Sequence, residues 1–339
     1  MIPKINSILF ATDLSKNSTY AFSHAVDMAK RHDAKIVVLH AFEPIPAWAE
    51  GLARITDEMK VKQQEEIIEG IKKRLREFCK KTESQLGPPG VELVSKILVT
   101  RGYPPEEILN ATDEERCDVI VLGTHGKGFL AYTFLGSVSN AVLHRTRNPV
   151  FVIPLPSEKT ASEGDMIPQV KKILYATDLS KNSVYAFLYA VDMAKRHNAR
   201  IVILHTVEPV PESIYVEEGA MGMEAVLEKA KKQEQNADTE EITKRLQEFC
   251  KRAEKQTGPP CIELVSKILV PVGHPVEEIL KTAVAESCDA IVLGTHGKGF
   301  LKQTFLGSIA EDVLQRTPKP VFIIPLPSEK ADIDWDKMF

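Results

Sequence analysis

Two long stretches of this sequence repeat each other along almost the whole chain. "ATDLSKNS" occurs at residues 11–18 and again at 176–183, and "VDMAKRH" at 26–32 returns at 191–197, both with an offset of 165 residues. Farther along, "ELVSKILV", "LGTHGKGFL" and "PLPSEK" recur with an offset of 171. Two long copies indicate a tandem duplication rather than an array in which many short units stack. We therefore expect two units, each with a core of its own.

The length of the chain agrees with two domains, since domains of about 150 residues are typical. We expect the first domain over residues 1–156 and the second over residues 170–328. Between them, residues 157–169 are polar and contain Gly and Pro, which is typical of a linker. Residues 329–339 form an acidic tail.

The second copy is six residues longer than the first, and the extra residues lie between Thr206 and Glu248. The inserted region contains Met221 and Met223 beside glycines. We interpret it as a longer helical hairpin, with a flexible lid or a partner surface as the alternatives.

Short apolar segments alternate with amphipathic segments within each copy. In the first copy the pattern predicts strands at 7–12, 35–42, 91–99, 117–124 and 149–156, and helices at 15–34, 59–84, 104–117 and 136–146. This alternation, with continuously apolar strands, indicates an α/β fold with a doubly wound parallel sheet covered on both faces. Ligands of such sheets bind outside the carboxyl ends of the strands, at the switch point.

A glycine-punctuated loop follows the fourth expected strand in both copies. "GTHGKGFLAYTFLGS" runs from Gly123 to Ser137, and "GTHGKGFLKQTFLGS" runs from Gly294 to Ser308. Glycine permits a positive φ and a close approach of backbone N–H groups to a ligand, and the start of the next helix favours an anion. The loop lacks the GK[ST] ending of a P-loop, and no GxGxxG follows the first strand. The spacing predicts a phosphate-binding loop, with plain tight turns as the alternative.

These features together resemble the universal stress protein family. The loop matches the Gly-x2-Gly-x9-Gly-[Ser/Thr] pattern of its ATP-binding branch, and "ATDLS" places an Asp just after the first strand. "LH" closes the second strand, a Gly-x-Pro follows the third in "RGYP" and "VGHP", and "NPVFVIP" is the last strand. The resemblance covers nearly the whole chain except the linker and the tail. It implies two tandem Rossmann-like domains of the adenine nucleotide alpha hydrolase type, each a five-stranded parallel sheet of order 3-2-1-4-5 with helices on both faces.

The resemblance also implies an adenine nucleotide in each copy: ATP, or ADP or AMP, with Mg²⁺ as a further candidate. Asp13 and Asp178 would contact the ribose or support a phosphate-bound Mg²⁺. The other nucleotide-binding candidates of the first copy are Ala11, Thr12, Ala41, Leu122, Gly123, His125, Gly126, Gly136, Ser137, Val138 and Ser139. Those of the second copy are Ala176, Thr177, Thr206, Leu293, Gly294, His296, Gly297, Gly307, Ser308 and Ile309.

The two copies differ at one of these positions, because Ala310 stands where the first copy has Ser139. Losing a hydrogen-bond donor to a charged partner typically costs about 1.5–3 kcal/mol. The sequence therefore predicts that the first site binds its ligand more tightly than the second.

Several candidates have a structural alternative. Asp13 and Asp178 could cap the following helix, although Ser15 and Ser180 stand nearer to the capping position. We expect His40 and His205 to be core histidines rather than metal ligands. Four loop residues either contact a phosphate or face the solvent: His125, His296, Lys127 and Lys298.

Composition narrows the class of protein further. With 43% hydrophobic and 27% charged residues the chain resembles a soluble globular protein. A net charge of −4 lacks the excess of basic residues that is typical of nucleic-acid-binding proteins. No apolar run suffices for a membrane span, and the first residues read as a strand rather than a signal peptide, so we expect a cytoplasmic protein. The five scattered cysteines predict reduced thiols packed in the core.

We conclude from the sequence that this is a nucleotide-dependent stress or regulatory protein with little or no turnover. A slow ATPase or phosphotransferase is the alternative, although no paired carboxylates, activated nucleophile or arginine finger is recognisable. A sensor of another adenylated ligand or of a metal is a second alternative. The apolar last strands "PVFVIP" and "PVFIIP" are expected to pair within the chain, because each would otherwise be an exposed edge. Further homodimerisation is left open.

Overall fold

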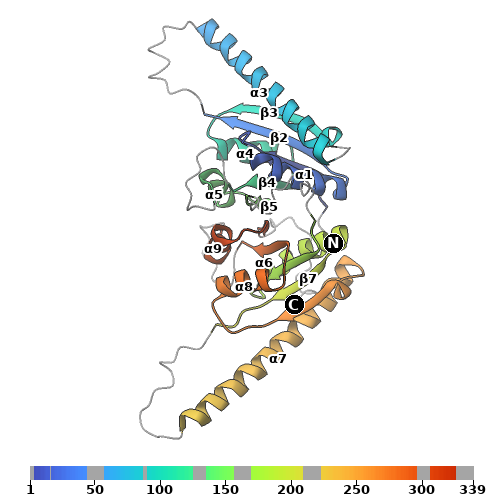
Figure 1. Cartoon of the computed structure of the whole chain (residues 1–339), viewed down its shortest axis with the longest axis vertical. Helices are drawn as coiled ribbons and strands as arrows, with labels where there is room; N and C mark the ends of the chain where they lie inside the picture. Colours follow the sequence, from blue (N-terminus) through green and yellow to red (C-terminus); the bar gives the residue numbers. More distant parts are fainter. Residues whose placement is uncertain are drawn as a thin grey trace.

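The structure is a computed structural model that describes residues 4–15, 17–43, 57–86, 90–124, 135–155, 169–208, 223–295 and 306–325. Its main feature is one sheet of ten strands that runs through both halves of the chain (Figure 1). The strands lie in the order β3-β2-β1-β4-β5-β10-β9-β6-β7-β8. Within each half this is the order 3-2-1-4-5, and all neighbouring strands of one half are parallel.

The elements of the first half follow the strand–helix alternation expected from the sequence. In chain order they are β1 (Ser7–Ala11), α1 (Asn17–His32), β2 (Lys35–Phe42), α3 (Asp57–Leu86), a 3₁₀ turn (Val91–Leu93), β3 (Val94–Arg101), α4 (Pro104–Glu114), β4 (Val119–Gly123), α5 (Ser137–Leu143) and β5 (Val150–Ile153). The strand predicted at 91–99 thus begins three residues late, because its first residues form the turn that leads out of α3. The tandem α/β fold with helices on both faces is confirmed.

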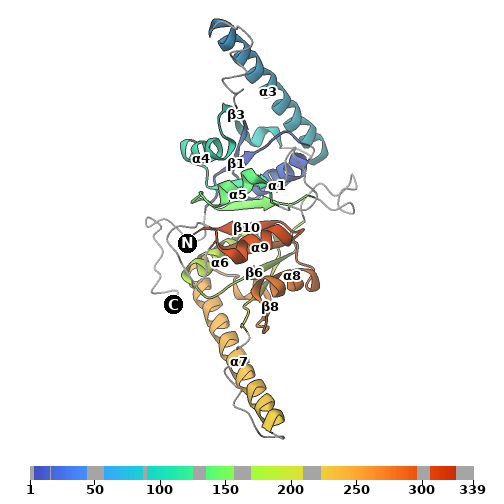
Figure 2. The same cartoon turned by 90° about the vertical axis from the view of Figure 1, so that its left-hand side faces the viewer.

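The second half repeats the series. Its elements are β6 (Lys172–Ala176), α6 (Lys181–His197), β7 (Arg200–Leu204), α7 (Met223–Thr257), a 3₁₀ turn (Ile262–Leu264), β8 (Val265–Leu269), α8 (Pro275–Ala285), β9 (Ala290–Gly294), α9 (Ser308–Arg316) and β10 (Val321–Ile324). The predicted hairpin is wrong from Met223 onward, since these residues form one helix; Met221 lies outside the described residues. The long helices α3 and α7 project from opposite ends of the molecule (Figure 2).

The apolar core consists of two clusters, one on each face of the sheet. Alternate residues of β1 separate accordingly: Ile8 and Phe10 join one cluster, and Leu9 joins the other. Helices α1, α3, α6 and α7 contribute to the first cluster, and α4, α5, α8 and α9 to the second. Each cluster draws residues from both halves, so the expectation of a separate core for each copy is wrong. The reason is that the sheet continues across the boundary between the copies.

The two halves join through their last strands. β5 and β10 pair antiparallel, with Phe151 opposite Phe322, and the centroids of these two rings lie 5.4 Å apart. An antiparallel pair of equivalent strands is related by a local two-fold axis, so this junction has the geometry of a symmetric dimer contact within a single chain. Neither β5 nor β10 is left as an exposed edge.

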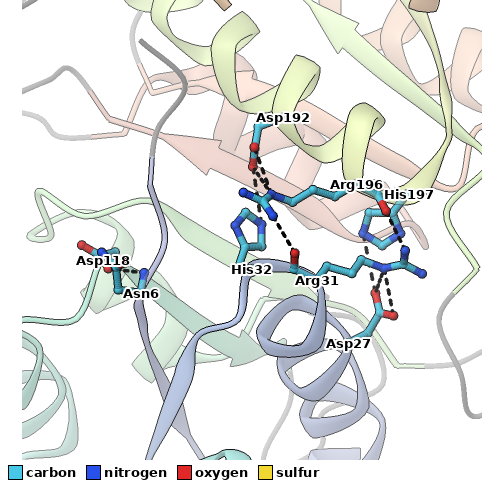
Figure 3. Close-up of polar contacts among 8 residues, drawn as sticks. All are labelled: Asn6, Asp27, Arg31, His32, Asp118, Asp192, Arg196 and His197. Carbon is cyan, nitrogen blue, oxygen red and sulfur yellow. Dashed lines mark hydrogen bonds and ion pairs between the residues drawn. The ribbon is translucent and has the colours of Figure 1, made fainter.

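The carboxyl ends of α1 and α6 meet beside this junction and exchange equivalent contacts (Figure 3). Arg31 donates from a guanidinium nitrogen to the backbone oxygen of Arg196 at 2.7 Å, and Arg196 donates to the backbone oxygen of Arg31 at 2.5 Å. Each Nε of these arginines also bonds the aspartate one turn earlier on its own helix, Asp27 or Asp192. Each arginine therefore caps the last carbonyls of the other half's helix while its own helix holds it in place.

Two buried histidines complete these contacts. Nε2 of His32 lies 3.4 Å from Asp192, and Nε2 of His197 lies 3.6 Å from Asp27. Burial and the neighbouring arginine of the other half lower the pKa of both histidines to about 4. We therefore interpret both contacts as hydrogen bonds from neutral imidazoles to the aspartates rather than as ion pairs, although the distances alone would suit charged partners. The same boundary encloses a cavity of about 20 Å³, which is about the space of one water molecule.

Candidate functional site

The strand order creates a topological switch point at the carboxyl edge of each half. β1 lies between β2 and β4, and the chain leaves β1 toward α1 on one face of the sheet but leaves β4 toward α5 on the other. Segments that diverge in this way leave a gap outside the strand ends. The second half repeats the arrangement with β6, β9, α6 and α9.

The residues after β1 form a tight turn held by their own side chains. Thr12 Oγ1 accepts from the N–H of Leu14 at 3.0 Å, and Asp13 Oδ1 accepts from the N–H of Ser15 at 3.0 Å. The second half makes the same two bonds from Leu179 to Thr177 and from Ser180 to Asp178, again at 3.0 Å. Consecutive side-chain acceptors of this kind stabilise a turn without any regular backbone pairing.

The turn also fixes an uncommon backbone conformation in both halves. Leu14 has φ of 60° and Leu179 has φ of 61°, a region that L-residues other than Asn and Asp rarely adopt. Such strain costs of the order of 1 kcal/mol and persists where the surroundings impose it, often at ligand sites. Both leucines also pack partly buried against the first core cluster. The strained leucine directly follows the aspartate at the end of β1 or β6.

Helix capping falls to the serines rather than to the aspartates where the structure describes it. Ser180 is the N-cap of α6, and its side chain accepts from the N–H of Ser183 at 3.3 Å. Asp178 Oδ2 is buried and has no hydrogen-bond partner among the described residues. Oδ2 of Asp13 is buried in the same way, but its Oδ1 accepts a second hydrogen bond, from Ser18 Oγ at 2.8 Å. The aspartates are therefore turn residues, and Asp178 accepts one hydrogen bond fewer than Asp13 in the described part of the chain.

The histidines that end the second strand of each half are satisfied within the protein. Nδ1 of His40 lies 2.7 Å from the backbone oxygen of Thr12, and Nδ1 of His205 lies 2.7 Å from that of Thr177. Since a carbonyl can only accept, Nδ1 is the donor in both rings. Both rings are buried. The prediction of core histidines is confirmed: they tie the second strand to the turn after the first.

Both ends of the glycine loop are anchored to the sheet. The N–H of Gly136 donates to the backbone oxygen of Thr124 at 2.5 Å, and that of Gly307 donates to Thr295 at 2.6 Å. Each threonine continues the ladder onto the last strand of its half, through its N–H to Ile153 or Ile324 at 3.0 Å. The loop thus leaves and re-enters at one point of the strand edge, directly before the helices α5 and α9.

The described glycines of the loop do not need a positive φ. Gly136 has φ of −68° and Gly307 has φ of −79°, and Gly258 is the one glycine with a positive φ among the residues that the structure describes. The expected use of left-handed backbone is therefore wrong at Gly136 and Gly307. The remaining physical reason for glycine there is its missing side chain, which permits the short contact to the threonine oxygen.

Ser139 makes a bond that the sequence did not predict. Its Oγ donates to the backbone oxygen of Gly123 at 2.8 Å, and the side chain is buried. Its hydrogen is thus engaged by the end of β4 rather than free for a phosphate. This removes the reason for expecting tighter binding in the first half. Ala310 is buried at the equivalent place in α9, where no such bond is possible.

The apolar candidates lie along the second core cluster. Leu122 and Leu293 are buried in it, Ala176 joins it, and Ala11 and Val138 pack against it partly buried. Ile309, by contrast, is 40% exposed. Four further candidates are Ala41, near the end of β2, Thr206, just past β7, and the exposed Ser137 and Ser308, which open α5 and α9.

Other candidates fall outside the described residues: His125, Gly126, His296 and Gly297, together with Lys127 and Lys298. The linker at 157–169, apart from Gln169, and the tail at 329–339 lie outside them as well. Within the described ranges, no group of three His, Cys, Asp or Glu side chains is placed to hold a metal ion. The five cysteines are buried free thiols, which confirms their placement in the core.

Sequence reasoning missed the roles of three residue pairs. Thr12 and Thr177 were predicted as ligand contacts, but their hydroxyls hold the turn. The "TDLS" pattern was the available signal, because a Thr or Asp side chain in a turn can accept from the N–H two residues later. The positive φ of the leucines had no signal in the sequence. Tyr175, which replaces Phe10 of the first copy, was also passed over, although its hydroxyl donates to the backbone oxygen of Ser183 at 2.5 Å.

The fold defines a class of protein: a tandem doubly wound α/β protein with a topological switch point at the carboxyl edge of each half. The model of the universal stress protein family matches residues 4–154 and again residues 169–325. The chain therefore belongs to the universal stress protein family, with two family domains in tandem.

Individual relatives match either one half or the whole chain. A universal stress protein of Methanocaldococcus jannaschii is 30% identical over 158 residues, which are 45% of this chain and 94% of that protein. One of Mycolicibacterium smegmatis is 23% identical over 319 residues, 94% of this chain and 96% of that protein. A crystal structure of a universal stress protein from Archaeoglobus fulgidus superimposes with a TM-score of 0.59 at 22% identity, covering 95% of this chain and 99% of that one. The last two have the tandem length.

Among the helices of the described residues, none combines the length and the apolar character that crossing a membrane requires.

Proposed function

We propose that this chain binds an adenine nucleotide, in the first place ATP, at the carboxyl edge of each half, and acts as a nucleotide-dependent stress or regulatory protein with little or no turnover. The observation that carries the proposal is Asp178 Oδ2, which is buried at the strand end without a hydrogen-bond partner among the described residues. A buried carboxylate oxygen without a donor is unfavourable, so a ligand that supplies a hydroxyl or a hydrated cation there gains free energy.

The residues around each crevice suit the parts of a nucleotide. Ala11 and Leu122 offer an apolar wall for the base, and Asp13 an acceptor for the ribose or for water on Mg²⁺. The first backbone N–H groups of α5 have no carbonyl partner within their own helix, and its first turn carries no acidic side chain, so they favour phosphate oxygens. Mg²⁺ would neutralise phosphate charge. The second half offers the equivalent residues, with Glu311 in the first turn of α9 as a difference.

We further propose the organisation of the chain around these sites. Residues 1–156 and 170–328 would be the two domains, joined by 157–169 and followed by the tail, and the β5–β10 pairing would let one chain form both sites without a second copy. Five free cysteine thiols favour a reducing compartment such as the cytoplasm.

The first test is the identity of any nucleotide that copurifies. Freshly purified protein is denatured, and the released small molecules are identified by chromatography and mass spectrometry. Between one and two adenine nucleotides per chain, mostly intact ATP, is the expected result. Recovery of ADP or AMP would favour the slow ATPase or phosphotransferase, and another adenylated compound would favour the sensor.

Calorimetric titration with ATP and Mg²⁺ tests the site itself. The double variant Asp13→Asn, Asp178→Asn is expected to weaken binding about tenfold or more, since hydrogen bonds to charged groups contribute about 1.5–3 kcal/mol. Asp33→Asn, an exposed aspartate at the end of α1, is the matched control and leaves binding unchanged. Absence of both copurified nucleotide and ATP binding in the unaltered protein would overturn the proposal.

A further inference from the structure

The two aspartates at the strand ends have the same place in the fold but different hydrogen-bond environments. Asp13 accepts from the N–H of Ser15 and from the hydroxyl of Ser18, which is 2.8 Å away. Asp178 accepts from the N–H of Ser180 alone among the described residues, whereas Oδ2 is buried alike in both aspartates, so the difference lies at Oδ1. The equivalent of Ser18 is present in the second half as Ser183, so the residue type alone does not explain the difference.

The hydroxyl of Ser183 is engaged elsewhere. Its Oγ lies 2.9 Å from Thr177 Oγ1 and 2.9 Å from the backbone oxygen of Ser180. Ser183 is buried, so its hydroxyl has no solvent to exchange with. A serine hydroxyl has a single hydrogen to donate, and here that hydrogen is directed away from Asp178.

The nearby difference between the halves is Tyr175, which stands where the first half has Phe10. The Tyr175 ring is fully buried against Phe187, with 4.9 Å between the ring centroids, and its hydroxyl donates to the backbone oxygen of Ser183 at 2.5 Å. The hydroxyl also interacts with Thr177. It therefore lies between the end of β6 and the first turn of α6, where it contacts the backbone of Ser183 and the threonine that bonds the Ser183 hydroxyl. Phe10 has no hydroxyl with which to do the same.

We propose that Tyr175 is a positioning residue that keeps the Ser183 hydroxyl off Asp178, so that the second site selects for the sugar hydroxyls of its nucleotide more strongly than the first site does. The inference rests on the proposed function and deepens it. A carboxylate that accepts one hydrogen bond gains more from a charge-assisted bond with a ribose hydroxyl than a carboxylate that already accepts two. A nucleotide without 2′- and 3′-hydroxyls then loses more affinity in the second half.

Selectivity within each half is the right quantity to measure, because other differences between the halves cancel. Glu311 in the first turn of α9 makes the two phosphate regions unequal, so overall affinity alone would not report on Asp178. The intact chain is photolabelled with 8-azido-ATP, and ATP or 2′,3′-dideoxy-ATP is titrated as a competitor. Peptide mass spectrometry separates the label of the two halves, which gives a dissociation constant for each competitor in each half.

The expected result is that removing the sugar hydroxyls weakens binding about tenfold in the second half and less than about threefold in the first. Tyr175→Phe lowers the ratio of the dissociation constants of 2′,3′-dideoxy-ATP and ATP in the second half toward the ratio of the first half. The reciprocal Phe10→Tyr raises this ratio in the first half. Tyr185→Phe, which removes a tyrosine hydroxyl bonded to Tyr189 on α6, is the matched control and changes neither ratio.

Equal ratios in the two halves of the unaltered protein would overturn the inference while leaving nucleotide binding in place. Unequal ratios that do not respond to Tyr175→Phe or to Phe10→Tyr would overturn the role of Tyr175. Protection of neither half by ATP would overturn the proposed function itself, and the inference with it. The comparison in the unaltered protein does not depend on whether a variant folds.

Discussion

At the scale of single residues, left-handed backbone recurs at equivalent places in the two halves. Besides the leucines of the turns, Asp33 follows α1 with φ of 53° and Asn198 follows α6 with φ of 52°. In both cases the next residue donates back to the helix, from Ala34 to Ala29 and from Ala199 to Ala194, which is the bonding of a Schellman motif. The motif is the same, but an aspartate fits it less well than an asparagine.

We expect Asp33→Gly to raise the free energy of unfolding by about 0.5–1 kcal/mol. Glycine adopts this conformation without steric cost, and the substitution also removes a negative charge from the end of a helix where the dipole disfavours it. Asn198→Gly, the matched change, is expected to gain less, because asparagine already tolerates left-handed backbone. Urea unfolding of both variants measures the difference. A loss of stability in Asp33→Gly would contradict this interpretation.

At the scale of elements, α1 and α6 are held end to end by reciprocal arginines. We expect Arg31→Ala and Arg196→Ala each to lower the free energy of unfolding by about 1–3 kcal/mol, since each change leaves an aspartate and a backbone carbonyl without a charged donor. Arg252→Ala, in an exposed pair with Glu248 on α7, is the control and costs less than about 0.5 kcal/mol.

The double variant Arg31→Ala, Arg196→Ala tests whether the two arginines act as one unit. Because they share partners across the junction, the cost of the double change is expected to differ from the sum of the single costs by at least about 0.5 kcal/mol. Strict additivity in denaturant unfolding would mean that the two helix ends are stabilised independently.

How far the sequence predicts such elements depends on the range of the interactions. The period of apolar residues places the first-half strands and helices to within a few residues, because that period reflects which face is buried. It cannot predict that Met223 starts one unbroken helix, that Ser139 turns to Gly123, or that Arg31 caps α6. Those outcomes depend on contacts between residues far apart in the chain, which leave no local pattern.

At the scale of the whole molecule, the boundary between the halves holds three buried histidines. Burial, with His197 nearby, lowers the pKa of His24 to about 3, and His32 and His197 have pKa values of about 4. These rings are neutral in the folded protein, whereas unfolding restores a pKa of about 6.5. Between these values the unfolded chain binds more protons, so stability falls as the pH falls.

We expect the free energy of unfolding to decrease by roughly 3 kcal/mol or more between pH 7 and pH 4.5. Asp27 and Asp192 contribute with the opposite sign, because burial raises their pKa values. The protonated aspartates stabilise the folded protein at acid pH, and this contribution is lost as the pH rises through their folded-state pKa values. Their pH window begins near the ordinary aspartate pKa and extends upward from there. Urea unfolding across this pH range measures the slope, and His32→Gln with His197→Gln should flatten it. A slope unchanged by both substitutions would contradict the role of these histidines.

Because β5 and β10 pair within one chain, the contact between the two halves does not depend on the concentration of the protein. Two separate chains joined by such a contact would dissociate on dilution, since their association depends on the concentration of free partners. A partner tethered on the same chain is instead present at an effective concentration in the millimolar range for a short flexible connection, whatever the abundance of the protein. The two halves are therefore paired in every folded copy, and the first molecules made in a cell carry the same pairing as the last.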